Sequence, residues 1–404
     1  MNIAAHVSPS GDLHAAMVEA ILRTSGTHTS RVEQALRAVP RHAFLPHATL
    51  EQAYDPDLAV ITKTAADGSA LSCASVPTLV ASMLEQLKVR PGDRIFECGA
   101  GTGYNAALLA CLASPGGAVT TIDVDPDIAA QAVGALRLAG YPDVRVLVGD
   151  GAFGAVTDAP FTRAIVTVGA WDLPSAWWDQ LAAGGRLVVP LRWRGQTRAV
   201  AFVHDGDGIM RSDSVQLCGF VPMIGQDGEK TAAIDSDGQV SLYWDADQPI
   251  SPSALTGALT APRSEAWTEV TVGPYDPFDG IWLRATATDP ANCRIAVGKA
   301  ANDSGLCTPA IAARSPALAE GESLAYFTHR RLEQGPEPPR SRLGAIGHGP
   351  HGQELAERLC KHIRAWDTDR SAEPKITARR PGHLPADPTV TAISKQHCSI
   401  TISY

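Results

Sequence analysis

The 404-residue sequence lacks the features that mark membrane and secreted proteins. No apolar run is long enough to span a bilayer, so we expect neither a membrane-spanning segment nor a membrane partner. The first nine residues have neither the basic start nor the apolar stretch of a signal peptide. The sequence therefore predicts a cytoplasmic protein.

Positive charge is also scarce. Lysine and arginine total 34 against 43 acidic residues, which leaves a formal net charge of −9 at pH 7. Proteins that bind nucleic acid normally carry a basic surface that meets the phosphates. Since no such surface is evident, we expect no nucleic-acid partner.

Metal-ligand patterns are missing as well. The eight cysteines are scattered, and none belongs to a Cys-x-x-Cys pair of the kind found in zinc ribbons and redox sites. His348 and His351 lie close in sequence but form no wider ligand pattern with their neighbours. We expect thiols that are free or buried in a reducing compartment, and no metal site.

The composition that remains is typical of a globular protein, with 45% hydrophobic and 19% charged residues. The length exceeds that of an ordinary domain with a single core, so more than one domain is expected. We predict an N-terminal extension over residues 1–88, a central α/β domain over 89–225 and a third region over 226–404.

Helical spacing of apolar residues predicts helices over residues 12–24 and 30–39, the second of them capped by Ser30. Pro77 begins a further helix that continues to about residue 88, since proline is well tolerated in a first helical turn. Residues 41–75 hold turn formers and few periodic signals, and we expect short strands and loops there.

Strands and helices then alternate, which predicts a doubly wound parallel sheet covered on both faces. Two further strands over residues 198–219 close this domain. After residue 225, turn formers and β-type runs such as 280–288 become frequent, and one helix stands out over 353–366. We read 226–404 as an α+β domain. The alternating elements are expected at 94–98, 104–113, 118–123, 126–139, 144–150, 161–168 and 186–190.

A glycine-rich turn connects the first strand of this sheet to its helix. The turn runs from Glu97 through Gly99, Ala100 and Gly101 to Gly103. Glycines let the backbone turn sharply and let a ligand approach closely, and the helix N-terminus suits a carboxylate. The Gly-x-Gly-x-Gly spacing departs from the dinucleotide fingerprint. It resembles motif I of class I methyltransferases.

Acidic residues follow the next two strands. Asp123, with Val124 after it, ends the second strand, and a carboxylate there can accept hydrogen bonds from ribose hydroxyls. Gly149, Asp150 and Gly151 end the third strand, where an adenine would lie. Open α/β sheets bind ligands at these strand ends. The pattern predicts a nucleotide-type cofactor site, with S-adenosylmethionine favoured over NAD.

Residues 12–225 resemble the protein-L-isoaspartate O-methyltransferase family. The resemblance implies a class I methyltransferase fold with an N-terminal extension that carries substrate-site residues. It also implies S-adenosylmethionine as methyl donor, S-adenosylhomocysteine as product, and a carboxylate of a peptide as acceptor. The matching segments are residues 39–46, 53–55, 75–77, 97–109, 149–151, 159–161, 180–181 and 184–190.

Two features depart from the repair enzymes of that family. Residues 63–72, which precede Ser75, are longer and more polar, and a long C-terminal region follows the sheet. Both resemble the lanthipeptide-associated branch found in ribosomal-peptide gene clusters, including the FxLD-system enzymes. That branch implies methylation of an aspartate side chain in a modified precursor peptide, which then gives aspartimide and isoaspartate. Isoaspartyl repair and a non-catalytic scaffold that binds S-adenosylmethionine stay open as alternatives.

The acceptor chemistry needs alignment rather than a base. A carboxylate with a pKa of about 3.9 is ionised at neutral pH and is already a nucleophile. Ser75 is the candidate that hydrogen-bonds the acceptor, near the N-terminus of the Pro77 helix, although it could equally be an ordinary helix cap. Tyr54 and Asp55 are expected to line the same pocket. Either a monomer or a homodimer is compatible with the sequence.

Overall fold

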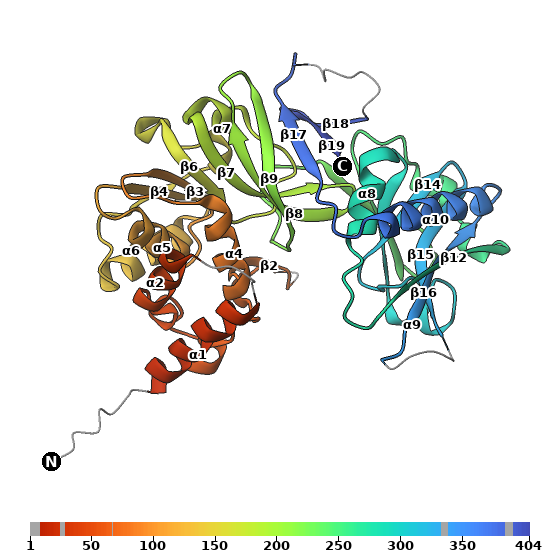
Figure 1. Ribbon diagram of the computed structural model, residues 1–404, viewed down its shortest axis with the longest axis horizontal. Helices are drawn as coiled ribbons and strands as arrows, with labels where there is room; N and C mark the ends of the chain where they lie inside the picture. The colour runs from red at the N-terminus through yellow and green to blue at the C-terminus, as the bar shows by residue number, and fades with distance from the viewer. Residues whose placement is uncertain (1–8, 25–28, 67, 333–337, 384–390) are drawn as a thin grey trace. The chain divides into compact units, whose positions relative to one another are not determined.

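The computed structural model describes residues 9–24, 29–66, 68–332, 338–383 and 391–404. The first eight residues, on which the expectation about a signal peptide rests, lie outside the described residues. The chain divides into two compact units (Figure 1). The first comprises Met1–Leu191 and Thr197–Ile224, and the second comprises Arg192–Gln196 and Gly225–Tyr404.

The first unit begins with the predicted helices. They are α1 (Pro9–Thr24), α2 (Ser30–Ala38) and α4 (Pro77–Leu87). The cap of α2 was predicted one residue too late. Thr29, and not Ser30, is the N-cap, and its hydroxyl accepts the Val32 N–H at 3.4 Å.

The segment between α2 and α4 contains more helix than expected. A 3₁₀ turn, η1 (Arg41–Phe44), precedes the short helix α3 (Leu50–Tyr54). A hairpin of β1 (Val60–Thr64) and β2 (Ala70–Ala74) follows. The helix α3 was missed, yet it is marked by a Thr-x-x-Gln capping box in which the side chains of Thr49 and Gln52 each accept the other's backbone N–H.

The centre of the first unit is a sheet in which the strand order is β9-β8-β7-β6-β3-β4-β5. Its strands β5, β4, β3, β6 and β7 are parallel, whereas β8 and β9 pair antiparallel. The helices α5 (Tyr104–Ala113) and α6 (Pro126–Leu138) connect β3 to β4 and β4 to β5. The strand bounds are Arg94–Cys98 (β3), Ala118–Asp123 (β4), Arg145–Val148 (β5), Phe161–Val166 (β6), Leu181–Trp193 (β7), Gln196–His204 (β8) and Ile209–Leu217 (β9). Short elements η2 (Gly151–Phe153), η3 (Val156–Asp158) and α7 (Ser175–Gln180) lie between β5 and β7.

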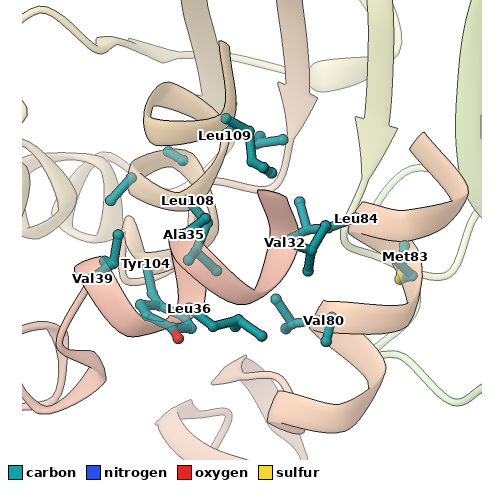
Figure 2. Packing of buried hydrophobic residues seen from close by; sticks show 14 of the residues in the cluster. Val32, Ala35, Leu36, Val39, Val80, Met83, Leu84, Tyr104, Leu108 and Leu109 are labelled. Atoms are coloured by element: carbon teal, nitrogen blue, oxygen red, sulfur yellow. The ribbon is translucent and has the colours of Figure 1, made fainter. Parts of the chain in front are cut away.

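One hydrophobic core joins the N-terminal helices to this sheet (Figure 2). Leu36 of α2, Leu84 of α4 and Leu108 of α5 are each at most 1% exposed. Burying a leucine side chain stabilises a fold by about 1.5–3 kcal/mol. The N-terminal extension is therefore held firmly, and its loops are fixed beside the carboxyl ends of the strands.

The second unit is built on a seven-stranded antiparallel sheet in the order β10-β11-β13-β14-β15-β16-β12. The helix α10 (Gly352–Thr368) packs on β12, β15 and β16 and matches the helix predicted over 353–366. Three further antiparallel strands are β17 (Lys375–Arg379), β18 (Ala392–Ser394) and β19 (Ser399–Ser403). The other bounds are Glu229–Ala233 (β10), Val240–Asp245 (β11), η4 (Pro252–Leu255), η5 (Ala258–Thr260), Arg263–Val272 (β12), Asn292–Val297 (β13), α9 (Lys299–Asp303), Ser315–Glu320 (β14), Ser323–Arg331 (β15) and Ser341–His348 (β16).

The run at 280–288 was predicted as β-type, and this is wrong. It forms the helix α8 (Gly280–Thr288), which packs against α10. Ile281, Trp282 and Thr286 are all buried, and the Trp282 Nε1 donates to Asn292 Oδ1 at 3.1 Å. Because tertiary packing buries nearly every side of this helix, its β-branched and aromatic residues are accommodated there.

Among the described residues, no helix is both long and apolar enough to cross a membrane. No group of three or more His, Cys, Asp or Glu side chains gathers there as metal ligands. His348 is buried in the second unit and stacks on Tyr326, with ring centroids 5.7 Å apart.

Candidate functional site

A cavity opens at the carboxyl ends of β3 and β4 in the first unit. It holds about 1110 Å³ of space not occupied by protein atoms, a value that includes the open solvent at its mouth. Segments far apart in the sequence line it together. They include Arg41, the end of the β1–β2 hairpin (Leu71 to Ser75), the glycine turn (Cys98 to Thr102), Asp123, Val124, Asp150, Gly151, Thr167, Val168 and the stretch from Phe220 to Ile224.

The glycine turn uses its glycines for different physical reasons. Gly99, Gly101 and Gly103 all have positive φ, at 100°, 52° and 83°, a region that L side chains rarely adopt. A Cβ on Gly99 would collide with the hydroxyl of Thr167, which donates to the Gly99 carbonyl at 2.7 Å. A Cβ on Gly101 would point into open space, with only the Cys73 carbonyl 4.0 Å away. The turn is therefore open beside Gly101, and we call this open position the Gly101 cradle. Gly103 is the N-cap of α5.

The predicted acids line the same cavity. Asp123 Oδ2 accepts the Gly101 N–H at 3.0 Å, and Asp150 is the N-cap of η2, where Oδ1 accepts the Ala152 N–H at 2.8 Å. Both carboxylates keep further lone pairs for a ligand. Val124 is 47% exposed at the rim. The remaining glycines of this group lie at the end of β5, where Gly151 lines the cavity and Gly149 does not.

Glu97 lies behind the glycine turn and does not line the cavity. Its side chain is fully buried, and Oε1 accepts a hydrogen bond from Asn105 Nδ2 at 2.7 Å. Oε2 is buried as well. Burial raises the pKa of Glu97 to about 7, against the opposing effects of the Thr121 hydroxyl and the Asn105 amide. Since Asn105 does line the cavity, Glu97 acts on the site through that amide.

Ser75 is half-buried on the wall of the cavity, and it is not a helix cap. The N-cap of α4 is Val76, which makes no side-chain capping bond. The expected anion site at the α4 N-terminus is absent from the described structure, because Pro77 has no N–H and Thr78 N–H is bound to the Pro56 carbonyl at 3.2 Å. The Ser75 hydroxyl is the group that this segment offers to a ligand.

Tyr54 and Asp55 do not line the cavity, contrary to expectation. Tyr54 is buried, stacks on His14 with ring centroids 5.1 Å apart, and places its Oη 2.5 Å from His42 Nδ1. Asp55 is exposed and uses Oδ1 to accept the Asp57 N–H at 2.9 Å. Both residues therefore stabilise the N-terminal extension, because their polar groups are engaged there.

Sequence reasoning missed three contributions to the site. Arg41 is 1% exposed, and its Nη2 donates to the carbonyls of Ala74 and Ser75 at 3.2 and 2.8 Å. Its position as a charged residue inside the largely apolar segment 39–46 could have indicated that Arg41 has a role in the site. Thr167 and the stretch 220–224 follow strands directly and carry no motif that could have marked them.

The residues present fit the expected cofactor. Gly101 leaves room for close approach, Asp123 and Asp150 present carboxylates to the cavity, and Ile122 and Ile128 add apolar walls. Such a set of few polar groups on an apolar cavity is usual for small-molecule sites.

Comparison with known proteins agrees with this geometry. Residues 13–228 match the family model described as protein-L-isoaspartate(D-aspartate) O-methyltransferase. The chain is 37% identical over 213 residues to a protein-L-isoaspartate O-methyltransferase from Methanopyrus kandleri, which covers 52% of this chain and 91% of that protein. It is 39% identical over 215 residues to one from Methanoculleus marisnigri, again covering 52% and 91%.

A solved structure of a protein-L-isoaspartate O-methyltransferase aligns with 96% of this chain and 99% of its own, with a TM-score of 0.52 and 17% identity. At this identity the likeness concerns the fold alone. It confirms the predicted α/β methyltransferase fold, and the aligned share includes most of the C-terminal α+β region.

Proposed function

The chain belongs to the protein-L-isoaspartate O-methyltransferase family, and we propose that it methylates the free carboxylate of isoaspartyl residues in peptides and proteins. It is an S-adenosylmethionine-dependent carboxyl methyltransferase. The observation that carries the proposal is the position of Ser75, which lines the same cavity as the Gly101 cradle and the Asp123 carboxylate. A methyl donor and an acceptor held by these residues would share one enclosed space.

Gly101, Asp123 and Asp150 are the residues that would hold the donor, which supplies an electrophilic methyl group when bound. The acceptor carboxylate is ionised at neutral pH, so the chain need not provide a general base. Among the described residues, no protein group forms a hydrogen bond with the Ser75 hydroxyl, so this hydroxyl can donate to the acceptor. The chain contributes alignment of the two reactants, and such alignment is worth several kcal/mol.

A second candidate function is methylation of an aspartate side chain in a modified precursor peptide of the lanthipeptide type. The feature that favours it is the long, polar hairpin segment 63–72 before Ser75. The C-terminal region no longer favours it, because a solved isoaspartyl methyltransferase aligns over 96% of this chain. We rank isoaspartyl methylation first because the family model and the curated relatives are described as protein-L-isoaspartate O-methyltransferases, and a purely scaffolding role last. A peptide-binding role for residues 226–404 remains a proposal under either function.

Mass spectrometry on a matched peptide pair tests the proposal. One peptide carries isoaspartate and the other carries aspartate at the same position, and each is incubated with enzyme and S-adenosylmethionine. We expect one methyl group to be added to the isoaspartyl peptide only. Methylation of ordinary aspartate in a cyclised peptide, followed by net loss of water, would favour the second candidate. No methylation of either would contradict both.

A further inference from the structure

The cavity is lined by a buried cation, Arg41, that no acid among the described residues neutralises. Arg41 lies in η1, and its Nη2 is occupied by the carbonyls of Ala74 and Ser75. Its Nε and Nη1 are buried without a hydrogen-bond partner. Among the described residues no carboxylate forms an ion pair with it. The guanidinium lies over the ring of Tyr104, with Cζ 5.2 Å from the ring centroid.

A buried charge is unfavourable unless it is paired and hydrogen-bonded. Only Nη2 of the Arg41 guanidinium donates hydrogen bonds, and its two acceptors are uncharged carbonyls. The positive charge of the guanidinium therefore remains uncompensated. Because Arg41 lines the cavity, the missing partner can come from a bound ligand. The chemistry of that partner is an anion with oxygen acceptors.

Tyr104 offers a second unused donor in the same place. It is the first residue of α5, it lines the cavity, and it is only 3% exposed. Its Oη is buried and has no hydrogen-bond partner in the described residues. Burial raises the pKa of Tyr104 to about 12, so the hydroxyl stays protonated and can donate. Its ring belongs to the core cluster around α2 and α5, which fixes the hydroxyl in position (Figure 2).

We propose that Arg41 and Tyr104, together with Ser75, form the subsite that binds the acceptor carboxylate, an inference that rests on the proposed function. The guanidinium supplies the opposite charge, and the two hydroxyls supply further donors. A carboxylate has two oxygens, so one can be held by these donors while the other attacks the methyl group. The methyl–sulfur bond of the donor would break, with its electron pair left on the sulfur as a neutral thioether. Arg41 also fixes the Ser75 backbone, since it binds that residue's carbonyl directly.

The methionine carboxylate of the donor would be the other anion in this cavity. Mutation distinguishes the two carboxylates. A variant that loses the site of the donor's carboxylate binds the cofactor more weakly, and a variant that loses the site of the acceptor's carboxylate binds the peptide more weakly. Tyr104→Phe is the cleanest variant, since it removes a hydroxyl that no protein group uses. Arg41→Met removes the charge, and Arg41→Lys restores it. Arg23→Met, at an exposed position near the end of α1, is the control for a general loss of positive charge.

The experiment measures three quantities for each variant. These are the dissociation constant for S-adenosylhomocysteine, the KM and kcat for an isoaspartyl peptide, and the binding of that peptide and of its carboxamide analogue to the protein loaded with S-adenosylhomocysteine. Tyr104→Phe should raise KM by roughly tenfold, as expected for the loss of a hydrogen bond to a charged group, with unchanged cofactor affinity and thermal stability. Arg41→Met should abolish the preference for the carboxylate peptide, and Arg41→Lys should restore part of it.

Unchanged KM and unchanged carboxylate preference in Tyr104→Phe and Arg41→Met would overturn the inference. A loss of cofactor affinity with peptide binding intact would also overturn it, by placing the donor's carboxylate at Arg41. If Arg41→Met does not fold, Tyr104→Phe still decides the question. Wild-type protein that binds the carboxylate peptide selectively but transfers no methyl group would contradict the proposed function and leave this subsite standing.

Discussion

The backbone N–H of Gly101 donates a hydrogen bond to Asp123 Oδ2 at 3.0 Å. This bond ties the turn after β3 to the end of β4, so the open cradle and the carboxylate beside it form one rigid corner of the cavity. The other oxygen of Asp123 accepts the Asp125 N–H at 3.1 Å. The carboxylate is therefore oriented before a ligand binds, and it keeps lone pairs for sugar hydroxyls.

Replacing Asp123 by alanine should weaken binding of S-adenosylhomocysteine by about 10- to 100-fold, because hydrogen bonds to charged groups contribute about 1.5–3 kcal/mol. Isothermal titration calorimetry measures this directly. Asp127→Ala is the matched control, since that side chain is 81% exposed and outside the cavity lining. Equal affinities for the two variants would remove Asp123 from the cofactor site.

Gly101→Ala should separate backbone strain from obstruction of the cradle. A left-handed alanine costs roughly 1–2 kcal/mol at any such position, so Gly101→Ala and Gly116→Ala should lose similar stability. Gly116 has φ of 81°, open space around its Cα and no part in the cavity. Only Gly101→Ala places a methyl group in the cradle, and we expect only it to lose cofactor affinity. Parallel loss of affinity in both variants would indicate a general folding effect instead.

The buried Glu97 should make the stability of the cofactor-free protein depend on pH. Its folded pKa of about 7 lies above the ordinary 4.5, so the folded state holds a proton that the unfolded chain releases between these values. Stability contributed by this group is thus present below about pH 4.5 and is lost as pH rises through 7. Glu97→Gln has no ionisable group at this position, so it should not lose this stability. The difference in the free energy of unfolding can reach about 3 kcal/mol, since a difference of one pKa unit corresponds to about 1.4 kcal/mol.

Urea unfolding near pH 5 and pH 8 checks this prediction. The variant should gain stability relative to the wild type mainly at the higher pH, and Gln keeps an oxygen for the Asn105 amide. A difference between the two proteins that is the same at both pH values would show that Glu97 is ionised throughout.

Local patterns were sufficient to predict the sheet and to place the glycine turn and Asp123 at the sheet edge where the cavity lies. The glycine turn and Asp123 each follow directly from a strand, so their position relative to the sheet edge is set within a few residues of sequence. The helix α8 was not predictable in this way. Its β-branched and aromatic residues have strand propensity, and packing in the second unit overrides that preference.

The proposed acceptor half of the site depends on contacts between distant segments. Arg41 reaches Ser75 across 34 positions in the sequence, and residues 220–224 arrive from beyond β9. No local spacing encodes such contacts. Tyr54 and Asp55 were expected to line the cavity because a matching segment contains them, but their polar groups are engaged with His42 and Asp57 instead.

Methyl transfer by Ser75→Ala, measured together with cofactor affinity, tests the central claim most directly. Wild type and variant are given labelled S-adenosylmethionine and an isoaspartyl peptide, and Ser236→Ala, an exposed serine in the second unit, serves as control. We expect Ser75→Ala to bind S-adenosylhomocysteine as the wild type does and to lose most of its methyl transfer. Wild-type turnover in Ser75→Ala would contradict the assignment of this cavity wall as the acceptor site.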